Sequence, residues 1–494
     1  MAARSMTRPV RPWFLLAALI ALLGSGPASA SDSAGLPSLG RAGGGAIALS
    51  DEYQLGLQIM REIRRQGALF DDPLLRDYLQ SIGHRISSNS ENPELPFYFF
   101  PVRDNSINAF ALPGGFIGVN TGLVLLADDE DELAGVMAHE VAHVTQRHVA
   151  RSVEAASGMN LKALAAMLGA IAIAASGVSA DTAQGALVAA QAYTQQQQIN
   201  FTRANEYEAD RVGIQILADA GFDPEGMIDF FEKMQRDSAW VEARRPEFLS
   251  THPLSSSRLN EARQRARRLE VAQVPKGRLF PLMVARTRVL MAEHPRDAVD
   301  WFSKRKPDDA SRYGLAIALT AAGRAAEAVP VAEALVASDA SLAPYHLALA
   351  EAQVAAGMPE RADASYALAV HLFPTSTALA LSHAEWLLAR GQPARAHETI
   401  IELLQTVPDE PVHYRLLARA AEAAGSPADA RYYQAEQYLL QGDLFGAMDQ
   451  LRQALAVPGS SEFQRARYQA RFDRLLGIAA TLTQQQRDRI ARDR

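Results

Sequence analysis

A regular repeat in the C-terminal part of the chain constrains the fold more than any other feature of the sequence. Glycines recur at equal intervals, and an alanine follows each glycine at a fixed offset; the pairs are Gly323 and Ala328, Gly357 and Ala362, Gly391 and Ala396, and Gly425 and Ala430. The interval is about 34 residues, the period of tetratricopeptide helix pairs, which bury their apolar faces only by stacking on neighbouring units. We therefore expect an all-α repeat solenoid over residues 279–480, with a plain helical bundle as the alternative.

The residue types within each unit predict its local structure. The glycine is expected to turn the chain between two helices, and the alanine to lie where the helices cross and leave no room for a larger side chain. Pro374 and Pro408, which are separated by the same interval, are expected to stop the second helix. Gly442 and Ala447 repeat the offset half a period later, which indicates that two units share one helix there.

The N-terminal segment 1–30 predicts a secretory signal peptide. Arg4, Arg8 and Arg11 accompany an apolar run from Trp13 to Leu23, and a small-x-small cleavage site ends at Ala30. A retained membrane anchor is the alternative, but the run is shorter than the roughly 20 residues of a bilayer span. The chain has no cysteine, so it folds without disulfides and offers no cysteine for a lipid anchor. These features fit a bacterial periplasm.

Between these two regions we expect a mainly helical domain with a small β-sheet over residues 51–270. Residues 31–50 are rich in Gly, Ala and Ser and predict a flexible lead-in, 271–278 predict a linker, and 481–494 form a polar tail. Phe97 to Val102 predicts a strand, which Pro96 and Pro101 mark either as an edge of the sheet or as a strand end. Residues 107–112 and 116–120 surround Pro113-Gly114-Gly115 and predict a hairpin.

The sequence His139-Glu140-Val141-Ala142-His143 indicates a metal site. Its apolar spacing predicts a helix, capped by Asp128 or Asp129. Residues four apart on a helix project from one face, so the two imidazoles can bind one zinc ion per subunit. Glu140 can lie beside the water at the fourth position and act as general base.

A third ligand must come from elsewhere in the chain. His148 is expected to face away on a continuous helix, and the position of the third metzincin histidine is Val149. A helix from about residue 205 to a C-cap at Gly221 carries Glu206 and Asp210 on one face. Glu206 is the candidate third ligand. We place Asp210 among the candidate catalytic residues because it can orient a ligand histidine. Glu208 is expected to point away into solvent.

The combination of His139-Glu140-x-x-His143, Glu206-x-x-x-Asp210 and His252-Pro253-Leu254-x-x-x-Arg258 resembles the CAAX-prenyl-protease-like zinc metallopeptidases. With the signal peptide and the repeats, the chain is similar to their periplasmic members. The resemblance implies that His139, His143 and Glu206 bind zinc and that Glu140 is catalytic. It also implies that His252 occupies the open zinc position until substrate arrives, and that the repeats engage the outer-membrane barrel-assembly machinery.

From the residues alone, the roles of the His252 loop stay open. His252 can be a fourth ligand, a hydrogen-bond donor to the transition state, or a loop residue. Arg258 can stabilise an oxyanion or anchor the loop through a salt bridge. The apolar segment Ala163 to Ala180 can be a lid, a helix in peripheral contact with a membrane, or an ordinary buried helix.

We therefore expect a periplasmic zinc endopeptidase that degrades stalled or misassembled outer-membrane β-barrel proteins and assists their maturation. An exposed hairpin strand near the zinc would pair with extended substrate. The alternative is a repeat-based chaperone or scaffold in which zinc is structural or latent, since repeats form concave peptide-binding surfaces. The formal net charge of −7 argues against nucleic acid as a main partner.

Overall fold

The computed structural model describes residues 48–155, 203–237, 246–269, 271 and 277–481. The predicted signal peptide, nearly all of the lead-in and the polar tail, and the segment Ala163 to Ala180 lie outside these residues. No helix among the described residues combines the length and apolar content needed to cross a bilayer.

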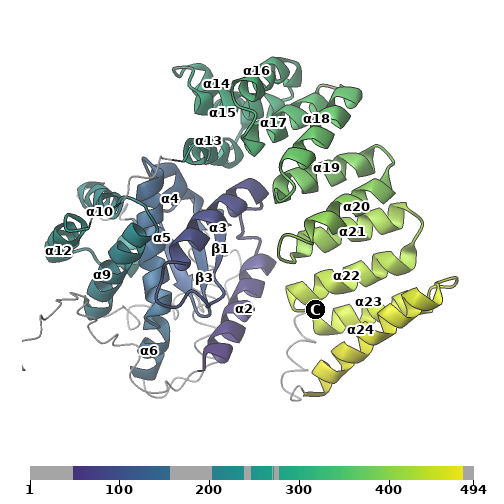
Figure 1. The fold of residues 1–494 in the computed structure, drawn as a ribbon, viewed down its shortest axis with the longest axis horizontal. Coiled ribbons are helices and arrows are strands. Elements are labelled where there is room, and N and C mark those ends of the chain that lie inside the picture. The colour runs from purple at the N-terminus through teal and green to yellow at the C-terminus, as the bar shows by residue number, and fades with distance from the viewer. Residues whose placement is uncertain (1–47, 156–202, 238–245, 270, 272–276, 482–494) are drawn as a thin grey trace, which may run out of the picture. The chain divides into compact units, whose positions relative to one another are not determined.

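The described chain is mainly helical with one small sheet, which confirms the predicted fold class (Figure 1). The N-terminal portion consists of α2 (Leu49–Arg65), α3 (Pro73–Ser87), β1 (Tyr98–Val102), β2 (Ala109–Leu112), β3 (Phe116–Asn120), α4 (Thr121–Leu126), α5 (Glu130–Thr145), α6 (His148–Ala155), α9 (Arg203–Asp219), α10 (Glu225–Asp237), α11 (Phe248–Thr251) and α12 (Ser256–Ala266).

The C-terminal portion contains only helices among its described residues. They are α13 (Leu279–Met291), α14 (Pro295–Ser303), α15 (Asp309–Ala321), α16 (Ala325–Ser338), α17 (Ala343–Ala355), α18 (Pro359–Leu372), α19 (Thr377–Ala389), α20 (Pro393–Leu403), α21 (Pro411–Ala423), α22 (Pro427–Gln441), α23 (Leu444–Ala456) and α24 (Glu462–Thr481). From α15 on, each helix packs against the next, which is the stacking that a solenoid requires.

The sheet has the strand order β1-β3-β2, with β1 parallel and β2 antiparallel to β3. The predicted hairpin is confirmed, since Leu112 pairs with Phe116 across the turn. Gly114 and Gly115 have φ of +78° and +90°, a conformation that favours glycine. The edge position predicted for the first strand is also confirmed.

Helix α5 crosses the centre of the N-terminal portion and contacts α3, α9, α10 and β2. The Asp129 side chain caps it by accepting a hydrogen bond from the Glu132 amide at 3.1 Å. Helix α9 approaches α5 closely at Gly213, because a Cβ atom there would lie 3.1 Å from Cα of His139. This approach sets the spacing between the two helices that carry the candidate ligands.

The repeat geometry follows the predicted residue roles. The four turn glycines have φ between +69° and +75°, and the four alanines are at most 1% exposed. Pro374 lies two residues beyond the end of α18, but α20 already ends at Leu403, so Pro408 does not itself stop that helix. Helix α22 packs against both α21 and α23, as the other helices inside the stack pack against their two neighbours, and the helix shared by two units stays a prediction.

Candidate metal centre

Helix α5 supplies two histidines that face each other one turn apart. Nε2 of His143 lies 3.0 Å from Nε2 of His139, and both side chains are almost completely buried. Two ring nitrogens held this close in a buried site need a proton or a cation between them, because their lone pairs repel.

Helix α9 brings Glu206 to this pair. Its carboxylate oxygens lie 3.7 Å from Nε2 of His139 and 3.6 Å from Nε2 of His143. Burial alone would raise the pKa of Glu206, but His252, His139 and Arg258 outweigh it and hold the pKa below its ordinary value. The carboxylate is therefore available as an anionic donor.

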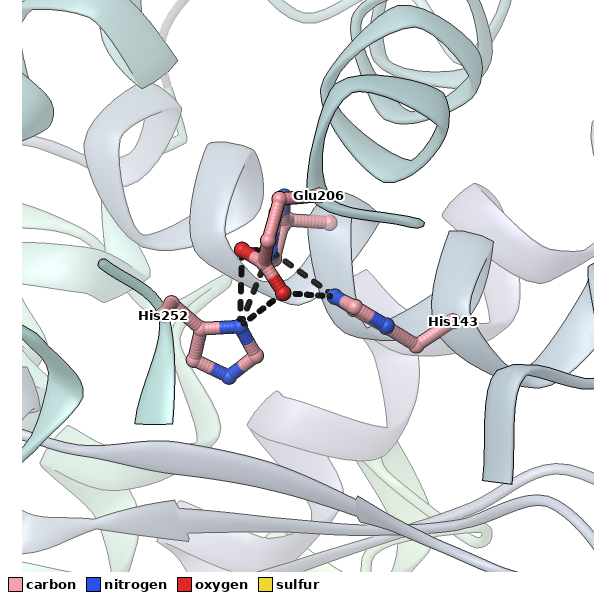
Figure 2. Close-up of side chains that lie close together, drawn as sticks. His143, Glu206 and His252 are labelled. Atoms are coloured by element: carbon pink, nitrogen blue, oxygen red, sulfur yellow. Dashed lines mark hydrogen bonds and ion pairs between the residues drawn. The ribbon is translucent and has the colours of Figure 1, made fainter. Parts of the chain in front are cut away.

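The loop after α11 brings a third imidazole. Nδ1 of His252 lies 3.2 and 3.3 Å from the two carboxylate oxygens of Glu206, and 3.3 Å from Nε2 of His139. Figure 2 shows His252 and His143 approaching Glu206 from opposite sides. The ring of His252 also lies 4.8 Å from that of Phe248, against which it packs.

These donors fit a zinc ion. Donor atoms about 2.1 Å from zinc at tetrahedral angles lie about 3.4 Å apart, and the separations among His139, His143 and Glu206 run from 3.0 to 3.7 Å. The four donors come from His139, His143, Glu206 and His252, and they lie within 4.8 Å of one another. Imidazole and carboxylate ligands are the usual set for catalytic zinc.

Glu140 lies beside this group without belonging to it. Its Oε1 is 3.3 Å from Nε2 of His252, and its side chain is 1% exposed. Burial raises the pKa of Glu140, although His252 and His139 oppose that effect. A carboxylate with a raised pKa, next to the donors, has the properties of a general base.

Asp210 and Arg258 support the centre from behind His139. Asp210 Oδ1 lies 3.1 Å from Nδ1 of His139. Arg258 donates to the two oxygens of Asp210 at 2.7 and 2.8 Å, pairs with Glu206 at 2.9 Å and donates to the carbonyl of Pro253 at 2.7 Å. Burial alone would raise the pKa of Asp210, but Arg258 and His139 outweigh it and hold the pKa low.

The expectation that His148 faces away is wrong. Helix α5 ends at Thr145, and Arg147 has φ of +54°, so the chain changes direction before α6 and the angle counted along one continuous helix does not apply. Nδ1 of His148 lies 2.8 Å from Nδ1 of His143. Burial lowers the pKa of His148 to about 4, although Glu208 opposes that effect.

The expectation that Glu208 is solvated is also wrong. Its side chain is 5% exposed, and Oε2 lies 3.2 Å from Nε2 of His148 and accepts from Arg151 at 2.9 Å. In the sequence, the only sign of this arrangement is the alternation of acidic residues at 206, 208 and 210. That alternation does not reveal α6, the partner that covers Glu208.

Comparison with known proteins places this centre in a family context. The model of peptidase family M48 matches residues 73–266, which contain every residue of the centre. The chain is 35% identical over 471 residues to the beta-barrel assembly-enhancing protease of Escherichia coli (strain K12), with 93% of this chain and 96% of that protein covered. It is 33% identical over 458 residues to the putative beta-barrel assembly-enhancing protease of Vibrio cholerae, with 90% and 93% covered.

A more distant likeness is confined to part of the chain. The mitochondrial metalloendopeptidase OMA1 of Schizosaccharomyces pombe is 30% identical over 185 residues, which is 37% of this chain and 51% of that protein. The bacterial alignments, by contrast, include both the region of the metal centre and the repeats.

Proposed function

The chain belongs to the beta-barrel assembly-enhancing proteases of peptidase family M48 and is a metalloendopeptidase, and from this premise we propose that it is a zinc enzyme acting on misassembled or stalled outer-membrane β-barrel proteins. The observation that carries the proposal is the buried donor group of His139, His143 and Glu206, with Glu140 beside it. The names of the bacterial relatives support the substrate class.

In the proposed site, His139, His143 and Glu206 hold the ion, and Glu140 acts as general base. Bound zinc supplies a polarised water that is ionisable near neutral pH. Glu140 takes the proton of the attacking water and passes it to the leaving amine. The Nδ1–H of His139 donates a hydrogen bond to Asp210, which keeps the ring proton on Nδ1 and leaves Nε2 free to bind the metal.

We further propose that His252 occupies the fourth position in the resting enzyme and leaves it when substrate binds. Two contacts support this role: Nδ1 lies among the donor atoms, and Nε2 lies 3.3 Å from Glu140. One ring therefore covers both the open position and the base. Arg258 anchors the loop through the carbonyl of Pro253, and we assign it that role instead of oxyanion stabilisation because Asp210, Glu206 and Pro253 already engage its guanidinium.

The domain boundaries and location complete the proposal. We assign residues 51–270 to the peptidase and 279–480 to a repeat domain that binds the barrel-assembly machinery. The predicted signal peptide, the absence of cysteine and the bacterial relatives support a periplasmic location. A chaperone-like contribution would come from the repeats, whose stacked helices form extended binding surfaces.

The test is a Glu140→Gln variant that keeps the size of the side chain. Cleavage of an unfolded outer-membrane β-barrel protein should slow by about 10²- to 10⁴-fold, the usual contribution of a general base, while the zinc content stays at that of the parent. The matched control is Glu360→Gln, which changes an exposed acid on α18 and should leave the rate unchanged.

Parent-like cleavage by a zinc-loaded Glu140→Gln variant would refute the catalytic assignment. Rescue of barrel assembly in cells by that variant, but not by a chain without the repeats, would instead favour the scaffold alternative.

A further inference from the structure

The second ring nitrogen of His143 has a partner that the proposed mechanism does not use. In Figure 2 one nitrogen of this ring faces Glu206 and the other points away from it. The nitrogen that points away, Nδ1, lies 2.8 Å from Nδ1 of His148. His148 is completely buried, and it comes from α6, which contains none of the candidate ligands.

The groups on either side of His143 and His148 determine which ring nitrogen of each histidine bears the proton. If Nε2 of His143 binds the metal, its proton must be on Nδ1. The facing Nδ1 of His148 lies within hydrogen-bond distance and must then accept, since two N–H groups cannot point at each other. The proton of His148 is therefore on Nε2, and that atom lies 3.2 Å from a carboxylate oxygen of Glu208, which can accept it.

The far end of the chain of contacts is anchored by a cation. Arg151 donates to the same oxygen of Glu208 at 2.9 Å and lies 3.5 Å from the side-chain oxygen of Asn205. The contacts thus run from His143 through His148 and Glu208 to Arg151. Behind His139 they run through Asp210 to Arg258, so the chain of contacts behind His143 contains one additional imidazole.

We infer that His148 is a positioning residue for the metal, one that orients the ring and fixes the tautomer of His143, and that Glu208 and Arg151 hold His148 in the accepting state. The inference rests on the proposed function, because it takes His143 as a ligand. Groups that orient ligand histidines typically change metal affinity or activity by about 10- to 100-fold when they are removed.

The test measures zinc affinity of the full chain by competition with a chromophoric chelator. His148→Leu removes the acceptor and should raise the dissociation constant by about 10- to 100-fold. His148→Asn places an oxygen near the position of Nδ1, accepts from His143, and should stay within about tenfold of the parent. The Co²⁺-loaded His148→Leu protein should also show shifted visible absorption bands, because the ring of His143 is no longer fixed.

The matched control is His371→Ala, which removes an exposed histidine on α18 and should not change the affinity. If His148→Leu does not fold, as judged by the melting temperature of the metal-free protein, Glu208→Leu tests the same chain of contacts from its far end. It leaves both histidines intact, removes the oxygen that accepts from His148 and Arg151, and should raise the dissociation constant by about tenfold.

Parent-like zinc affinity of a folded His148→Leu or Glu208→Leu variant would overturn the inference. Equal losses in His148→Leu and His148→Asn would overturn it as well, because they would assign the effect to packing and not to the hydrogen bond. Failure of the parent itself to bind zinc stoichiometrically would be a different result, since it would refute the proposed metal site.

Discussion

The contact of Asp210 with His139 can be tested by Asp210→Asn, which replaces one carboxylate oxygen with an NH₂ group. In the structure one carboxylate oxygen of Asp210 lies near Nδ1 of His139 and Arg258, and the other accepts from Arg258 alone. An amide of the same shape has only one acceptor oxygen. Whichever way it is turned, its NH₂ group meets an N–H of His139 or of Arg258, so at least one buried donor loses its acceptor.

The magnitude follows from the burial of this pair. Arg258 is 2% exposed, and removing one partner of a buried ion pair typically costs about 3–5 kcal/mol. Arg258 keeps its contacts with Glu206 and Pro253, so we expect a loss of about 3 kcal/mol in the unfolding free energy of the metal-free protein. Zinc affinity should fall by about 10- to 100-fold, since His139 is no longer held in one orientation.

Urea unfolding of the chelated protein and zinc competition measure the two effects separately. Combining Asp210→Asn with Arg258→Met should cost less than the sum of the single changes, because the amide can then turn its oxygen to His139 without facing a guanidinium. A coupling energy of about 1 kcal/mol or more is expected for residues in contact. An additive double-mutant cycle, or parent-like zinc affinity of Asp210→Asn, would refute this reasoning.

Three further changes test other parts of the molecule. His252→Ala should raise proteolysis and self-cleavage, measured as initial rates, and an unchanged or lower rate would remove the proposed switch. Gly213→Ala would place a Cβ 3.1 Å from the backbone of His139 and should lower both the unfolding free energy, by about 1–3 kcal/mol, and the zinc affinity; Gly477→Ala, where the space is open, is the control and should do neither. Burial lowers the pKa of His383 to about 4, whereas its pKa in the unfolded chain is about 6.5. As the pH falls from about 6.5 to about 4, the unfolded chain takes up this proton before the folded one does, so the unfolding free energy decreases by up to about 3 kcal/mol. His383→Phe should therefore reduce the fall in melting temperature between pH 7.5 and pH 5, and an equal fall in parent and variant would contradict this.

Much of the fold was predictable because its determinants are local and periodic. Each repeat has a glycine that must adopt positive φ and an alanine that must fit where two helices cross. The conformation of Gly323 and the burial of Ala328, and those of their equivalents, could therefore be predicted from the sequence. The hairpin was predictable for the same reason, since Gly114 and Gly115 serve a turn between two apolar runs. Pro408 shows the limit of this reasoning, because α20 ends at Leu403 for reasons that one proline does not encode.

The centre was predictable only where a helix stays regular. The proximity of His139 and His143 could be predicted from their spacing on an uninterrupted helix. Glu206 could be selected as the third candidate because other positions were less suitable and because Asp210 lies one helical turn further on. His148 could not be found in this way, because Arg147 leaves the helical conformation with positive φ. A positive φ at a residue other than glycine is uncommon and depends on tertiary contacts, so the local sequence does not predict it.

Helix α9 links these observations into one constraint on the site. Three of its carboxylates face three different histidines: Glu206 faces His143, Asp210 faces His139, and Glu208 faces His148. A slide of α9 by one residue is about 1.5 Å along its axis and would stretch all three contacts together. Gly213 resists such a slide, because the helices touch there without any side chain between them. Metal affinity in this protein should therefore depend on the register of α9 against α5 as strongly as on any single ligand.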